Sequence, residues 1–154
     1  MDRRRVLGIL GLGLITPYTL TFHRVLNAAA DPALPTRSSA NREVFSLSVA
    51  SGDPSPSGVV LWTRIDSAFH RPAEPLRFQV AEDRGFRRMV MEGAVEGSRI
   101  GPADDYTVKV DLDGQLGSNG RYYYRFLYGD ALSPTGRCRT APGAGMTPDK
   151  IKLA

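Results

Sequence analysis

Short stretches in which apolar and polar residues alternate fill the chain from residue 44 onward. The clearest example is YTVKVDLDG over 106–114, where every second residue is apolar. In RYYYRFLYG over 121–129, aromatic side chains at the even positions share one face. A period of two among β-branched and aromatic residues is typical of β-strands. We therefore predict seven strands, within 44–49, 58–65, 75–83, 89–97, 106–114, 121–129 and 133–141.

The segments between these strands carry the residues that turns require. SGDPSPSG, GSRIGPADD and DGQLGSNG each supply Gly, Pro, Asp or Asn where the chain has to reverse. Seven short strands separated by such turns predict an all-β fold. The expected architecture is an antiparallel β-sandwich over 44–142, of the immunoglobulin or fibronectin type III kind, with about seven strands.

Two aromatic residues refine this prediction. Trp62, the one tryptophan, lies in a strand pattern and is expected to be a core ring. Leu116 precedes Tyr122 by six residues across a turn rich in Gly and Asn. That spacing resembles the tyrosine corner of sandwich domains, in which the phenol bonds back to the loop backbone.

The first 30 residues have the order of an export signal. A cationic start precedes an apolar run over 6–22, and the small residues Ala28 and Ala30 follow as an A-x-A cleavage site. Arg3, Arg4 and Leu7 resemble the twin-arginine signature, and the apolar run is rich in glycine. We expect a leader over 1–30 that meets the export machinery, a signal peptidase and, transiently, the membrane. An uncleaved membrane anchor is the alternative.

Export would deliver the protein to the periplasm or the medium by the twin-arginine route. The segment 31–43, rich in Pro, Ser and charge, is expected to be a flexible lead into the sandwich. The segment 143–154 is expected to be a linker.

Charge excludes one class of partner. The net charge of +4 comes mainly from the first 30 residues, since without them 16 basic and 15 acidic residues remain of 20 and 16. No basic stripe is left to suggest nucleic-acid binding. The single cysteine, Cys138, forms no intrachain disulfide, and beyond the leader His70 is the one histidine. The sequence thus offers no Cys and His cluster for zinc or iron.

The stretch SVASGDPSPSG over 48–58 is the place where catalysis would first be sought. A serine nucleophile needs a base and an oxyanion hole, and Ser51, Gly52 and Asp53 lack the Gly-x-Ser-x-Gly elbow. Proline and aspartate favour a structured loop here, with Asp53 capping the turn through its side chain. We therefore predict no catalytic, cofactor-binding or metal-binding residue in this chain.

Several blocks together resemble a known family. SVASGDPSPSGVVLWTRI, FQVAEDRGFRRMVMEGAV, DYTVKVDLDGQLGSNGRYYYRFLYGD and SPTGRCRTAP are similar, in this order, to the N-terminal domain of PhoD-type alkaline phosphatases. The resemblance runs to about Pro142. It implies a sandwich that precedes a metallophosphatase domain, which hydrolyses phosphate esters and is expected to hold calcium and iron. None of that catalytic domain lies within the 154 residues.

The resemblance implies that this chain is the non-catalytic N-terminal part of an exported phosphatase. Its partner would be the C-terminal metallophosphatase domain of the same polypeptide, which it packs beside and positions. Three alternatives stay open: a stand-alone exported binding module of fibronectin type, the N-terminal sandwich of a purple-acid-phosphatase-like enzyme, and an enzyme in its own right.

Overall fold

The computed structural model describes residues 21–23 and 39–146, and strands dominate this part of the chain. They form two antiparallel sheets, so the all-β prediction is confirmed. The three-stranded sheet has the order β2 (Val49–Gly52), β3 (Val60–Arg64), β6 (Thr107–Asp111). The six-stranded sheet has the order β1 (Thr21–His23), β5 (Met89–Val95), β4 (Leu76–Ala81), β7 (Arg121–Tyr128), β8 (Ala131–Leu132), with β9 (Gly136–Arg139) also paired to β7.

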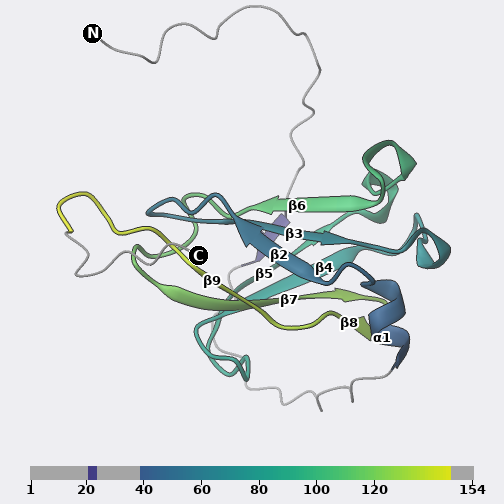
Figure 1. Ribbon diagram of the computed structural model, residues 1–154, viewed down its shortest axis with the longest axis horizontal. Coiled ribbons are helices and arrows are strands. Elements are labelled where there is room, and N and C mark those ends of the chain that lie inside the picture. Colours follow the sequence, from purple (N-terminus) through teal and green to yellow (C-terminus); the bar gives the residue numbers. More distant parts are fainter. Residues whose placement is uncertain (1–20, 24–38, 147–154) are drawn as a thin grey trace, which may run out of the picture.

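One hydrophobic core joins the two sheets. Leu61 and Val110 from the three-stranded sheet and Phe78 and Phe126 from the six-stranded sheet are fully buried in the same cluster. In Figure 1, β2, β3 and β6 lie on one side of the molecule and β7, β8 and β9 on the other. The sheets therefore bury one face each, as the alternating pattern predicts.

Alternation located the core side of most strands correctly. In β6, Val108 and Val110 are buried while Lys109 is exposed. In β7, the aromatic residues at even positions are buried. Arg125 is buried although it belongs to the other face of β7. The Phe86 ring covers it, with the guanidinium carbon 4.0 Å from the ring centroid.

The prediction that Trp62 is a core ring is wrong. Leu61, Thr63 and Ile65 are the buried residues of this segment, and Trp62 is half-buried on the opposite face, beside Lys109 of β6. The run GVVLWTRI is apolar at nearly every position, so its period does not reveal which face is inside. Thr63 can be buried in the core because its hydroxyl donates to the Ser48 carbonyl at 3.0 Å.

The strand predicted over 44–49 is also wrong. Helix α1 (Ser39–Val44) occupies the end of the segment 31–43, which had been expected to be flexible, and β2 begins only at Val49. Between them the chain turns through Ser48, whose φ is +64°. Phe45 is buried and Leu47 exposed, so these residues do not share a face. Their spacing arises from a helix end, a turn and a strand start.

The segment Thr21–His23 pairs with β5 as an antiparallel edge strand. It falls inside the predicted leader. The residues that carry the export and cleavage predictions, Arg3, Arg4, Leu7, Ala28 and Ala30, lie outside the described residues. Within 21–23 and 39–146, no helix has the length and apolar character needed to cross a membrane.

The connecting loops gather at the two ends of the sandwich. We call the loops 53–58, 113–119 and 141–146 the exit end, because the chain leaves the sheets there after β9 (yellow in Figure 1). We call the loops 66–75, 96–106 and 129–130 the far end. The far end contains the short 3-10 helices Ser67–Phe69, Gly97–Arg99 and Pro102–Asp104, and α1 lies beside it.

Candidate functional site

The stretch Ser-Gly-Asp-Pro-Ser-Pro-Ser-Gly over 51–58 comprises the last two residues of β2 and the loop that leads to β3 at the exit end. The Ser55 N–H donates to the Gly58 carbonyl at 2.9 Å and closes a turn. The hydroxyls of Ser55 and Ser57 both donate to Oδ1 of Asp113, at 2.5 and 2.6 Å. Two serines that look available for chemistry in the sequence are therefore bound to a carboxylate from another loop.

The carboxylate that holds this loop is Asp113, where Asp53 was expected. Asp53 is exposed, has a φ of +47°, and its carboxylate makes no hydrogen bond to any described residue. The hydroxyls of Ser55 and then Ser57 lower the pKa of Asp113 by stabilising its charged form. The sequence marks Asp113 as part of a turn, but nothing local links it to a loop 56 residues earlier.

Among the described residues, no histidine is placed to activate these serines. His70 lies at the far end, with Nε2 3.2 Å from the Gly97 carbonyl and its ring packed against Tyr106. Cys138 is buried, and burial raises the pKa of its thiol to about 11, so the nucleophilic thiolate is disfavoured. Neither a serine nor a cysteine mechanism has its parts assembled in the described residues.

Tyr122 and the loop after Leu116 form a second connection at the exit end. The Gly117 N–H donates to the Tyr122 hydroxyl at 3.0 Å, and both Tyr122 and Leu116 are buried. The Thr140 hydroxyl donates to the Gly117 carbonyl at 2.6 Å and accepts from the Gly120 N–H at 2.9 Å. Sequence reasoning missed Thr140, because its role depends on contacts with residues about 20 positions away.

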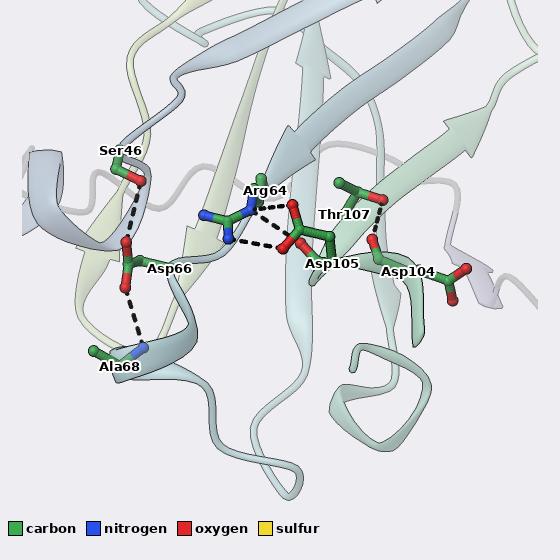
Figure 2. Close-up of polar contacts among 7 residues, drawn as sticks. All are labelled: Ser46, Arg64, Asp66, Ala68, Asp104, Asp105 and Thr107. Atoms are coloured by element: carbon green, nitrogen blue, oxygen red, sulfur yellow. Dashed lines mark hydrogen bonds and ion pairs between the residues drawn. The ribbon is translucent and has the colours of Figure 1, made fainter. Parts of the chain in front are cut away.

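The far end gathers several carboxylates, shown in Figure 2. Arg64 binds both oxygens of Asp105, with Nη2–Oδ1 at 2.9 Å and Nε–Oδ2 at 3.0 Å. Asp66 accepts from the Ala68 N–H at 3.1 Å and from the Ser46 hydroxyl at 3.3 Å. The bond from Arg64 lowers the pKa of Asp105, so this group stays ionised and is unsuited to act as a general acid. Asp66 thus caps the 3-10 helix Ser67–Phe69, and Asp105 forms an ion pair with Arg64.

A shallow pocket lies on the outer face of the six-stranded sheet, over β4, β5 and β7. Arg77, Gln79, Glu92 and Leu127 are among its lining residues. Gln79 accepts from Arg125 Nε at 2.8 Å and reaches Glu92 at 3.5 Å. The pocket thus contains a paired polar network and no nucleophile.

The calcium and iron that the resemblance implies need clustered ligands. Among residues 21–23 and 39–146, no group of three or more His, Cys, Asp or Glu side chains could hold a metal ion. Calcium takes six to eight oxygen ligands, which isolated surface carboxylates do not supply. The donor set described here does not fit either metal.

Comparison with known proteins identifies the family. Residues 28–142 match the family model of the N-terminal domain of PhoD-like phosphatases. Alkaline phosphatase D of Bacillus subtilis (strain 168) is 36% identical over 161 aligned residues, which cover 99% of this chain and 26% of that protein. A solved structure described as the structure of PhoD matches with a TM-score of 0.61 and 38% identity, over 69% of this chain and 21% of that one. The chain spans about a quarter of the relative's length, and it belongs to the PhoD-like phosphatase family, of which it contains the N-terminal domain.

Proposed function

We propose that this chain is the non-catalytic N-terminal β-sandwich of an exported PhoD-like alkaline phosphatase. In this proposal it packs beside a metal-dependent phosphoesterase domain of the same polypeptide and positions it. The observation that carries the proposal is the match of residues 28–142 to the family's N-terminal domain. The donor set supports it, because the described residues offer no cluster for a catalytic metal.

In this proposal the two domains contribute different physical properties to the enzyme. Metal-assisted hydrolysis needs a bound ion to lower the pKa of a water or to stabilise charge on the phosphoryl oxygens. The calcium and iron expected in the family would supply that chemistry, and their ligands would lie outside this chain. What this chain offers is a packed core and loops tied to one another, which suit a supporting domain.

The non-catalytic part is tested with the full chain alone. We expect the purified protein, supplied with calcium and iron, to release no phosphate from phosphate monoesters or diesters. Hydrolysis that follows the protein through purification and disappears in Asp53→Ala would contradict the proposal and identify the chain as an enzyme.

The positioning part is tested in a relative. In a replacement enzyme, this chain takes the place of the matched N-terminal quarter of B. subtilis alkaline phosphatase D; in a deletion enzyme, that quarter is missing. We expect the replacement enzyme to hydrolyse phosphate esters and the deletion enzyme to lose most of this activity. A fully active deletion enzyme would overturn positioning. A folded but inactive replacement enzyme would favour a stand-alone binding module.

The export part has its own test. An exported location agrees with membership of this family. Changing Arg3→Lys and Arg4→Lys together should retain the chain in the cytoplasm, whereas the control Arg24→Lys should not. Ala28→Leu with Ala30→Leu should leave the leader attached, whereas Ala29→Leu should allow cleavage. Export of the twin-lysine variant at the normal level would contradict the twin-arginine route.

A further inference from the structure

We propose that the exit end of the sandwich, formed by the loops 53–58, 113–119 and 141–146, is the surface that docks against the phosphoesterase domain. This inference rests on the proposed function and names the surface that performs it. Its starting point is the path of the chain. The matched relative is about four times as long as this chain, and the match is to an N-terminal domain, so the remainder follows residue 154 in such enzymes. The chain leaves the sheets at the exit end.

Charge distinguishes the three exit-end loops from the loops of the far end. The three exit-end loops carry only two charged residues, Asp53 and Asp113, and are otherwise made of Pro, Ser, Gly, Ala, Asn, Gln, Leu and Met. The loop 82–88 lies at the same end of the six-stranded sheet, because Ala81 pairs with Met89 and Tyr123 there. It carries five charged residues, Glu82, Asp83, Arg84, Arg87 and Arg88, and is not part of the proposed surface. The far end carries eight charged residues, Asp66, Arg71, Glu74, Glu96, Arg99, Asp104, Asp105 and Asp130. The cores of protein interfaces are depleted in charge because ions are costly to desolvate. The three exit-end loops fit the composition of an interface core, whereas loop 82–88 and the far-end loops have the charge that is typical of a polar rim.

The exit end is also preorganised. The Ala141 N–H donates to the Ser55 carbonyl at 2.9 Å, and the Leu116 N–H donates to the Ser57 carbonyl at 2.8 Å. The Asn119 N–H donates to the Ala141 carbonyl at 2.9 Å. All three loops are therefore joined by backbone hydrogen bonds, in addition to the serine bonds to Asp113. Loops fixed before association lose little conformational entropy on binding.

A large apolar side chain is exposed at this surface. Met146 is 49% exposed. Among the described residues the other exposed large hydrophobic side chain is Leu47, at 57%, which lies between α1 and β2 beside the far end. The Met146 N–H donates to the Gly143 carbonyl at 3.1 Å, so a turn directs the chain as it leaves. Burying this thioether against a partner domain is favourable, and the flexible side chain can adapt to the shape of the partner surface.

The rival surface is the outer face of β4, β5 and β7. Its polar groups are already engaged with one another, Arg125 with Gln79 and Gln79 with Glu92. The two arms of the test distinguish this face from the exit end.

Hydrogen exchange is compared between the chain alone and the replacement enzyme defined above. We expect amides in 53–58 and 113–119 to exchange at least about tenfold more slowly in the replacement enzyme. Amides of 66–75 and 96–106 should be unchanged. Unaltered exchange at the exit end, or new protection confined to the far end or to the outer face of β4 and β5, would overturn the docking surface.

Surface variants give the second readout. Gln115→Arg and Met146→Glu place charges at the exit end, whereas Ala103→Arg and Ala68→Glu are matched controls at the far end and Leu127→Arg tests the sheet face. In the chain alone all should unfold at nearly the parent temperature. In the replacement enzyme only the exit-end pair should weaken exchange protection and lower phosphate release. Equal losses from Leu127→Arg would move the interface to the sheet.

The two proposals fail in different ways. An active replacement enzyme with an unprotected exit end would retain the positioning function and reject this surface. A protected exit end in an inactive enzyme would retain the surface and reject positioning.

Discussion

Gly58 lies against the backbone of Asp113 so closely that no side chain fits between them. A Cβ at Gly58 would be 2.4 Å from the Asp113 Cα and 2.4 Å from the Leu112 carbonyl oxygen. The contact joins the loop after β2 to the loop after β6, where Ser55 and Ser57 bond to Asp113. It explains why glycine closes the Ser-Gly-Asp-Pro-Ser-Pro-Ser-Gly stretch.

Gly58→Ala should therefore destabilise the domain, by about 1–3 kcal/mol as overpacking of a backbone contact. Gly52→Ala, at the end of β2 just before this loop, is the matched control, because a Cβ there meets nothing within 4 Å. Urea unfolding of both variants measures the difference. Equal midpoints for the two variants would show that the loops separate freely, contrary to this account.

Tyr122→Phe should cost about 1 kcal/mol, because the Gly117 N–H loses its acceptor in a part-buried site. Tyr123→Phe is the control, since Tyr123 is half-buried on the other face and its hydroxyl bonds to no described residue. Thermal unfolding compares them. The tyrosine corner has no energetic role if both changes shift the midpoint alike.

Leu61→Ala should lower the free energy of unfolding by about 2–5 kcal/mol, as the loss of a fully buried leucine. Trp62→Ala should cost less than Leu61→Ala despite the larger side chain, because Trp62 stands half-buried outside the core. Denaturant titration ranks the two. The reverse order would place the tryptophan ring in the core after all.

Cys138 should react with a thiol reagent such as Ellman's reagent only after unfolding. Burial raises the pKa of its thiol from 9 to about 11, so the folded state prefers the neutral form. The stabilisation this gives is fully present below pH 9 and is lost as the pH rises from 9 toward 11, because the unfolded thiol ionises first.

The contribution of the Cys138 thiol to the pH dependence of the free energy of unfolding is measured by comparing the parent chain with Cys138→Ala. The variant is expected to be less stable at neutral pH, but its stability should fall less steeply between pH 9 and 11. Rapid labelling of the native parent at pH 7 would be incompatible with a buried thiol.

Regular alternation predicted most of the fold, and its failures have definite causes. Strand β6 has one apolar and one polar face, and β7 has an aromatic residue at every even position, so both existence and orientation follow from the sequence. The residues before Val49 alternate in the sequence by chance and do not form a strand. The run around Trp62 is apolar at nearly every position, so the sequence does not show which of its faces is buried. Strand β8 has two residues, too few for any period.

The polar contacts of the exit end were harder to predict than the strands. The sequence identified the serine-rich loop as structural, and it placed Tyr122 six residues after Leu116. The pairing of Ser55 and Ser57 with Asp113, and of Thr140 with Gly117, depends on which loops the topology brings together. Such long-range contacts leave no mark in local composition. They appear only once the sheets are assembled.

The most direct test of the central claim is phosphate release by the replacement enzyme and the deletion enzyme, measured at equal concentration of folded protein. The account predicts that the replacement enzyme releases phosphate at a rate within about tenfold of that of the parent B. subtilis enzyme. The deletion enzyme should lose about 100-fold or more of this rate, because a catalytic site with displaced groups reacts much more slowly. A deletion enzyme as active as its parent would contradict the claim that this domain positions the phosphoesterase.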